Sequence, residues 1–322
     1  MIVAHGGLDI GGTYIKAAVV AADGAIAAEG KIPTASYDGH EAVLDRAADL
    51  LLRLAASPQA NFAAVGAALP GLVDHARGVS RFLPNLHSHW RDVAVADLLS
   101  ARLGCGVHVL NDARAATLGE LHFGQGRGRL NVTLAYFGLG TGVGGGVVIN
   151  GTLRLGPLGA AGELGHQTVL PDGPRCGCGN YGCLEVFASG PAIAAEGIRM
   201  LQTGQAPALR DQVGGDVSKV TPKAMAEAAA ADASIADAIR RAARFLGIGV
   251  SNLIVTLHPD VVVIGGGVAA IGDLLMDTVR KTVRERVGIL PAESVEIVAS
   301  PLGTRGGMLG AAALAMRGGY IP

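Results

Sequence analysis

The stretch LDIGGTYIKAAVV, residues 8–20, decides the fold that the sequence predicts. It reads as a strand, a glycine turn and a second strand of β-branched and small apolar residues. The pattern returns in coarser form at residues 131–149, NVTLAYFGLGTGVGGGVVI. Two nearly equal halves that each open on a glycine hairpin predict a duplicated α/β fold, and 322 residues are enough for two domains around a cleft.

The rest of the pattern supplies further elements for both halves. Apolar residues at helical spacing, and a Thr-Pro start at 221–222, predict helices over 41–55, 222–232 and 235–257. Short apolar runs predict strands over 63–68, 107–110 and 261–267. We place a smaller N-terminal α/β domain at 1–120 and a larger C-terminal α/β domain at 121–306. We expect a helix at about 307–318 to pack back onto the first domain.

Composition excludes several classes of function. The 26 basic and 27 acidic side chains give a formal net charge of −1, which offers no basic field for nucleic acid or anionic lipid. No run of about 18 apolar residues escapes interruption, and the start MIVAHGGLDIGG lacks a signal-peptide pattern. We therefore expect a cytoplasmic protein that binds neither nucleic acid nor membranes.

Three of the four cysteines gather in one short segment, PDGPRCGCGNYGC, at 171–183. With His166 they give the spacing H-x9-C-x-C-x4-C, which is typical of a closed, structural zinc site. The predicted ligands are His166, Cys176, Cys178 and Cys183, with His122 as the alternative fourth ligand. The segment is too polar to form a hydrophobic core, so we expect a bound metal to hold it in place. The alternative is that three free thiols lie close together in the sequence by chance.

Phosphate binding is the second predicted chemistry. The first glycine turn carries Asp9, Gly11, Gly12, Thr13 and Lys16; backbone N–H groups can surround phosphate oxygens there, and Asp9 could hold hydrated Mg²⁺. An ordinary hairpin turn is the alternative. The second turn carries Gly140, Thr141 and Gly142, and we expect it to bind phosphate in the same way. The glycines after the buried strand, Gly265, Gly266 and Gly267, would let a flat base or ribose lie against the backbone.

Three acidic residues are candidates for catalysis and sugar binding. Asp112 comes just after a predicted strand, where α/β folds bind ligands, so it could accept the proton of an attacking hydroxyl. The equally supported alternative is that Asp112 only caps the following helix. Glu163 and Glu185 flank the cysteine segment and suit the vicinal hydroxyls of a sugar.

At this point the motifs resemble those of the ROK family (repressors, open reading frames and kinases). LDIGGTYIK, LNDA at 110–113, GLGTGVGGG, AGELGH at 161–166 and CGCGNYGCLE at 176–185 match in order from about residue 7 to the C-terminal helix. The resemblance implies an actin-like or hexokinase-like ATPase fold. It also implies transfer of the γ-phosphate of ATP, with Mg²⁺, to a hydroxyl of a hexose or N-acetylhexosamine.

Carried over residue by residue, the resemblance makes Asp112 the general base. Asn111, Glu163, His166 and Glu185 would bind sugar hydroxyls, with His166 also on zinc, and Asn85 would be a further sugar contact. The phosphates and Mg²⁺ would go to Asp9, Gly11, Gly12, Thr13, Lys16 and Thr141. Arg114 stands where the family often has Asn, and we expect it to be structural or to contact the substrate.

The resemblance leaves the sugar open. Glucose ranks first, and the alternatives are N-acetylglucosamine, N-acetylmannosamine, mannose and fructose. Some relatives are repressors that carry a winged helix ahead of the kinase-like body. We expect no winged helix here, because only seven residues precede Leu8. A sensor without catalysis is a further alternative. A homodimer or homotetramer is the expected assembly.

Overall fold

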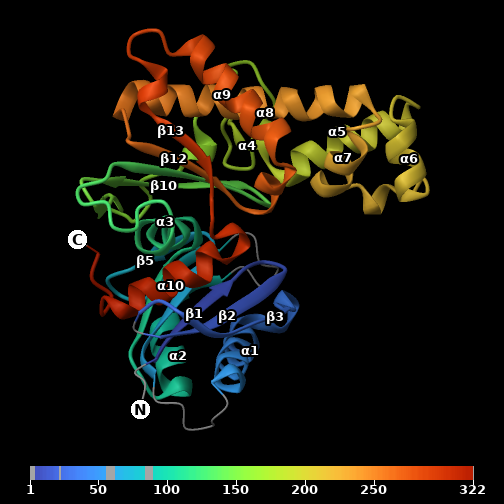
Figure 1. Ribbon diagram of the computed structural model, residues 1–322. Coiled ribbons are helices and arrows are strands. Elements are labelled where there is room, and N and C mark those ends of the chain that lie inside the picture. The colour runs from blue at the N-terminus through green and yellow to red at the C-terminus, as the bar shows by residue number, and fades with distance from the viewer. Residues whose placement is uncertain (1–3, 22, 56–61, 84–89, 322) are drawn as a thin grey trace. The chain divides into compact units, whose positions relative to one another are not determined.

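The computed structural model describes residues 4–21, 23–55, 62–83 and 90–321 (Figure 1). The chain divides into two compact units. The first comprises residues 1–132, 146–162 and 305–322, and the second comprises residues 133–145 and 163–304. The first unit is therefore assembled from three separate pieces of the sequence.

The first five-stranded sheet has the order β3-β2-β1-β4-β8. Its first three strands are antiparallel, and β4 and β8 then continue parallel to β1. Strand β4, FAAVGAAL, is a continuous run of apolar residues and glycine and is buried along nearly its whole length, as expected where both faces of a sheet are covered. The predicted glycine hairpin and the strands near 63–68 and 107–110 are confirmed. The strands are β1 (Ala4–Ile10), β2 (Tyr14–Ala21), β3 (Ile26–Pro33), β4 (Phe62–Leu69) and β8 (Val107–Asn111).

Helices and a small sheet complete this unit. The predicted helix over 41–55 is confirmed as α1 (Gly39–Leu54), whose apolar face is buried in the core. The other helices are α2 (Val95–Leu103), α3 (Asp112–Phe123) and α10 (Gly306–Met316). A three-stranded sheet is formed by β5 (Leu72–Asp74), β6 (Val79–Leu83) and β7 (Trp90–Val93).

Helix α10 packs against β1, β4 and α3, far from its place in the sequence. The contacts are backbone to backbone: a Cβ on Gly66 would overlap the Ala311 carbonyl, and one on Gly310 would overlap the Ala115 carbonyl. Such close approach explains why α10 reads GGMLGAAALAM, a sequence of small residues with little amphipathic pattern.

Gly310→Ala should therefore destabilise the protein. In an open helix the change would add up to about 1 kcal/mol of stability, but here the new methyl meets a carbonyl of α3 that cannot yield cheaply. We expect a net loss of about 1–3 kcal/mol in urea unfolding. Gly106→Ala, which adds a methyl to open space, is the control and should change stability far less. Equal stabilities for both variants would contradict the close packing of α10 on α3.

The second five-stranded sheet repeats the plan of the first, with order β11-β10-β9-β12-β13. A hairpin again occupies one side, and two parallel strands again extend the other. The predicted duplication of an α/β fold is therefore confirmed at the level of strand order. The strands are β9 (Leu134–Leu139), β10 (Val143–Ile149), β11 (Thr152–Leu153), β12 (Val261–Gly265) and β13 (Glu296–Ala299).

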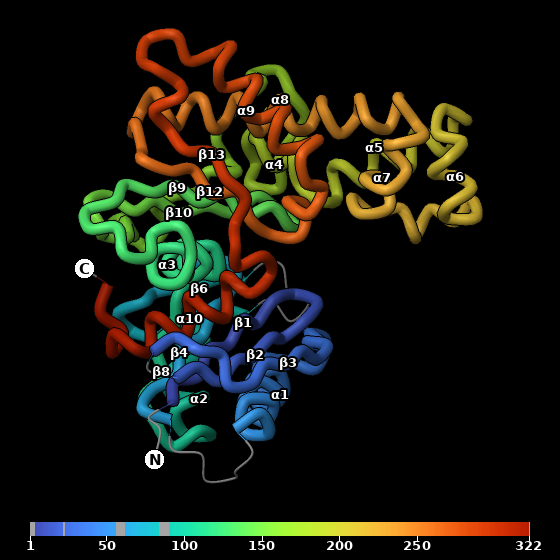
Figure 2. Tube along the Cα trace, viewed as in Figure 1, coloured from blue at the N-terminus to red at the C-terminus, as the bar shows by residue number. Residues whose placement is uncertain are grey.

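The remaining helices belong to the second unit. They are α4 (Glu185–Ala188), α5 (Gly190–Gln202), α6 (Pro207–Val213), α7 (Pro222–Ala228), α8 (Ala233–Leu257) and α9 (Asp273–Arg286). Helix α9 lies along α8 (Figure 2). Helix α7 ends four residues before the predicted 232, because the chain turns there and the buried Asp232 carboxylate accepts the Leu209 N–H. No helix in the described ranges, α8 included, has the length and apolarity needed to cross a membrane.

Candidate functional site

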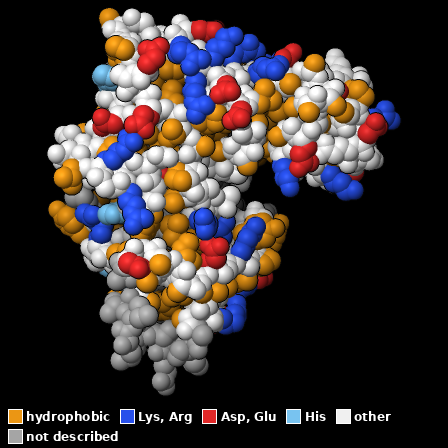
Figure 3. All heavy atoms as spheres, in the orientation of Figure 1, with side chains coloured by type: hydrophobic (Ala, Val, Ile, Leu, Met, Phe, Trp, Pro, Cys, Tyr) orange, Lys and Arg blue, Asp and Glu red, His pale blue; other side chains and the backbone are white. Residues whose placement is uncertain are grey.

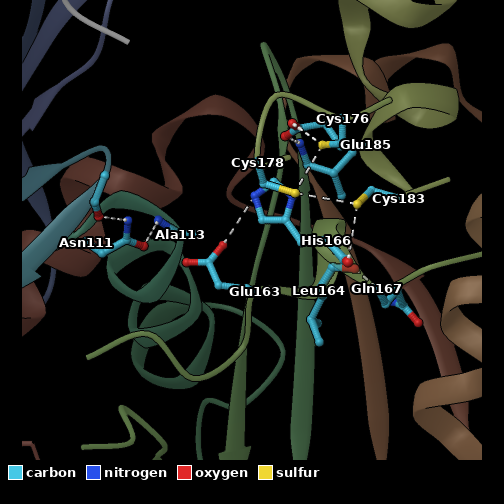
Figure 4. A network of polar contacts seen from close by, with 12 residues as sticks. Asn111, Ala113, Glu163, Leu164, His166, Gln167, Cys176, Cys178, Cys183 and Glu185 are labelled. Carbon is cyan, nitrogen blue, oxygen red and sulfur yellow. Dashed lines mark hydrogen bonds and ion pairs between the residues drawn. The ribbon is translucent and has the colours of Figure 1, made fainter. Parts of the chain in front are cut away.

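Four metal-ligating side chains meet in the second unit. The ligand atoms of His166, Cys176, Cys178 and Cys183 all lie within 4.8 Å of one another (Figure 4). His166 ends a short 3-10 helix, η2 (Leu164–His166), and Cys183 lies two residues before α4. Backbone hydrogen bonds from Leu184 to Gln167 and from Val169 to Gly182 bring the two segments together.

The spacing of these atoms fits a tetrahedral zinc site. With Zn–S bonds of about 2.3 Å and Zn–N bonds of about 2.0 Å, neighbouring ligand atoms stand roughly 3.5–3.8 Å apart. The Cys178 and Cys183 sulfurs are 3.7 Å apart, and His166 Nδ1 is 3.7 Å from the Cys176 sulfur. Three thiols and one imidazole would fill the four positions of such a metal and leave none open.

The thiols differ in how easily they lose their protons. Burial, with hydrogen bonds to Cys178 and Cys176, raises the pKa of Cys183 to about 12. The backbone N–H of Asn180 lowers the pKa of the exposed Cys178. Without a cation Cys183 stays protonated at neutral pH, so metal binding must release its proton.

The alternative ligand, His122, has a different setting. It lies in α3, where the Arg317 guanidinium is 3.3 Å from its Nε2. Burial and the charge of Arg317 lower the pKa of His122 to about 4, so the ring is neutral and its Nε2 accepts from Arg317. It is absent from the group of candidate ligands that the described residues form.

Both flanking glutamates lie beside the cysteine group. His166 turns Nδ1 to Cys176 and Nε2 toward Glu163, whose Oε2 is 4.0 Å away (Figure 4). Glu185 begins α4, and its Oε2 accepts the backbone N–H of Val143 at 2.9 Å. Glu163 is 47% exposed, so its oxygens remain accessible to a ligand.

At the start of α3, Asn111 is the residue that caps the helix. Its Oδ1 accepts the N–H groups of Ala113 and Arg114 at 3.0 and 3.2 Å, and its Nδ2 donates to the Gly71 carbonyl at 3.0 Å. The N-cap of α3 is therefore Asn111 and not Asp112. Asp112 is the half-buried first residue of α3, where the helix N-terminus favours a negative charge.

Arg114 is almost completely buried, with 1% of its surface exposed. Its Nη1 lies 3.2 Å from Asn111 Oδ1, to which it donates. The guanidinium thus supports the side chain next to Asp112, in line with the structural one of its two expected roles.

The first glycine hairpin brings its predicted residues together. Gly12 and Thr13 are exposed at the turn, which is closed by the Gly11 N–H donating to the Tyr14 carbonyl at 3.0 Å. The Asp9 carboxylate is 3.2 Å from Lys16 Nζ. Gly307, which was not among the predicted residues, also adjoins this turn: a Cβ there would stand 2.8 Å from Asp9 Oδ2.

The second hairpin is closed in a similar way. The Gly140 N–H donates to the Gly142 carbonyl at 2.9 Å, and Thr141 is exposed. Of the three glycines after β12, Gly265 packs against the Tyr136 ring, Gly266 has φ +84°, and Gly267 is exposed. The remaining predicted sugar contact, Asn85, lies outside the described residues.

A groove of about 460 Å³ lies elsewhere in the second unit, between α8 and α9. Figure 3 shows basic side chains gathered over these helices. The groove lining, however, contains three basic residues (Arg240, Arg244, Lys281) and three acidic ones (Asp273, Asp277, Glu285). With its charges balanced, the groove has no preference for an anion such as ATP.

Comparison with known proteins identifies a family for this chain. The chain matches the ROK family over residues 5–317. A glucokinase from Thermotoga maritima is 36% identical over 312 residues, covering 96% of each chain. A ROK family glucokinase from Streptomyces griseus, solved in complex with glucose and AMPPNP, superposes with a TM-score of 0.86 at 35% identity, covering 98% of this chain and 99% of that one.

A regulatory relative is also similar: a putative xylose repressor from a Caldicellulosiruptor species is 32% identical over 96% of this chain and 77% of its own length. The likeness to the solved kinase confirms the predicted fold class, a duplicated α/β fold of the actin-like or hexokinase-like ATPase type. The family match spans nearly the whole chain, and so the protein belongs to the ROK family.

Proposed function

We propose that this protein is an ATP-dependent glucokinase that converts glucose to glucose 6-phosphate. The observation that carries the proposal is the likeness, over nearly the whole chain, to a kinase whose structure holds glucose and AMPPNP. The side chains that such a reaction needs are present: a carboxylate at a helix start, exposed glycine turns, and a glutamate–histidine pair beside a cysteine group.

In the proposed mechanism Asp112 takes the proton of the 6-hydroxyl as that oxygen attacks the γ-phosphorus of ATP. The bond from that phosphorus to the bridging oxygen breaks, and ADP leaves. Asn111, Glu163, His166 and Glu185 bind the other hydroxyls, with Asn85 as a further contact. The N–H groups of the two glycine turns and Thr141 orient the phosphates, while Gly265, Gly266 and Gly267 face the nucleoside. Bound Mg²⁺ would neutralise phosphate charge, and Asp9, whose carboxylate adjoins Lys16, would hold its hydration shell.

Zinc has a structural role in this proposal. His166, Cys176, Cys178 and Cys183 would hold it, and the loop that they order would place Glu163 and Glu185. Because the four ligands leave no open position, the metal takes no part in phosphoryl transfer.

Two further expectations remain predictions. They are the division into domains at 1–120 and 121–306, and assembly as a homodimer or homotetramer.

An ATP-consumption assay over a panel of sugars tests the proposal. We expect the highest kcat/KM with glucose, and lower values with mannose, fructose, N-acetylglucosamine and N-acetylmannosamine. A preference for an N-acetylated sugar would keep the kinase and change its substrate. Sugar binding by calorimetry without any ATP turnover would contradict the kinase and favour a sensor.

A further inference from the structure

The peptide group of Val143 lies at the centre of an unusual set of contacts. Val143 opens β10, directly after the hairpin residues Gly140, Thr141 and Gly142. Its N–H donates to Glu185 Oε2 at 2.9 Å. A Cβ on Gly142 would overlap that same oxygen, so Glu185 Oε2 lies directly against the end of the turn.

Two further contacts hold the same hairpin. Gly165 packs so closely on the Val143 carbonyl that a Cβ there would overlap it. The Gly190 N–H donates to the Gly140 carbonyl at 2.8 Å. The hairpin is therefore fixed at both its first and last residues.

These contacts come from residues in or next to the loop 166–185, which we call the cysteine loop. Gly165 directly precedes His166, and Glu185 follows Cys183 by two residues. The second oxygen of Glu185, Oε1, is 3.8 Å from the Cys176 sulfur. One carboxylate thus spans from a cysteine of the metal-ligating group to the backbone of the glycine turn.

We propose that Glu185 is a positioning residue that locks the glycine hairpin 140–143 to the cysteine loop, in addition to any contact with the sugar. A backbone N–H bonded to a carboxylate forms a charge-assisted hydrogen bond, which is shorter and stronger than a neutral one. The bond fixes where the N–H groups of the turn point. Since that turn binds phosphate in the proposed function, on which this inference rests, Glu185 sets nucleotide affinity as well as sugar affinity.

Hydrogen exchange on the free protein tests, without any ligand, whether Glu185 holds the hairpin. In Glu185→Ala we expect the segment 138–149 to exchange at least about tenfold faster than in the unaltered protein, because the Val143 N–H loses its charged acceptor. Glu185→Gln keeps a carbonyl acceptor and should restore most of the protection. Asp172→Ala, which removes an exposed carboxylate from the same loop, should exchange like the unaltered protein.

Calorimetry with AMPPNP in the absence of sugar gives the functional readout. We expect Glu185→Ala to bind roughly tenfold more weakly and Asp172→Ala to bind normally. Gly142→Ala, which displaces the carboxylate without removing it, should weaken binding too. Zinc content and melting temperature establish that each variant is folded; if Glu185→Ala is not, Glu185→Gln and Gly142→Ala carry the test.

The outcomes separate this inference from the proposed function. Failure of the unaltered protein to bind AMPPNP would count against the kinase. Normal AMPPNP binding and normal exchange in Glu185→Ala, with glucose binding lost, would overturn the positioning role and leave Glu185 as a sugar contact alone.

Discussion

Replacing Asp112 by Asn is expected to lower kcat by roughly 10²–10⁴-fold, the usual loss when a positioned general base is removed. Asn keeps the size of the side chain but cannot take a proton from the sugar hydroxyl. It can also keep the hydrogen bond that Asp112 Oδ1 accepts from the Ala113 N–H at 2.8 Å. The KM values for glucose and ATP should therefore stay within a few-fold, and steady-state kinetics will separate the two effects.

A matched control is available in α2. Asp97 is likewise an acidic residue in the first turn of a helix, so Asp97→Asn removes the same kind of charge from the same kind of position. Its kcat should not change. If Asp112→Asn turned over at a near-normal rate, another group would have to take the proton.

Loss of the cysteine site is the second large effect that we expect. The purified protein should hold about one zinc ion per chain, and Cys183→Ser should hold almost none, because a buried hydroxyl replaces a thiolate ligand. The loop 166–185 has little apolar core of its own, so its order depends on the metal. We expect the melting temperature to fall by about 5–10 °C and kcat/KM for glucose to fall at least about 100-fold.

Elemental analysis, thermal unfolding and kinetics on the same preparation check this prediction. Cys105→Ser is the control, because Cys105 lies outside the metal-ligating group and should leave zinc content and activity as they are. Fully active protein that contains no zinc would rule out the structural role of the metal.

Much of this molecule can be predicted from local sequence. A glycine turn between β-branched runs specifies a hairpin, and cysteines at short spacing specify a metal loop, since neighbours in sequence are neighbours in space in both cases. The short strands β5 and β7, with three and four residues, are too brief to give a clear alternating pattern and went unpredicted.

The contacts that organise the site could not be predicted in the same way. Nothing near Val143 in the sequence points to Glu185, 42 positions away, because the bond uses a backbone N–H that every residue but proline carries. The identity of the residue that caps α3 also needed coordinates. Asn111 and Asp112 are both good caps, and only the helix start at Asp112 assigns the cap to Asn111.

The packing of α10 has a consequence for how the protein is made. Helix α10 is synthesised after the whole second unit, yet it packs on the glycine backbone of β1 and β4, which are synthesised before that unit. The first unit therefore cannot complete its core when its own early strands emerge, even though domains generally fold in the order of their synthesis. Until α10 has been synthesised, the apolar surface of β1 and β4 stays uncovered in the nascent chain.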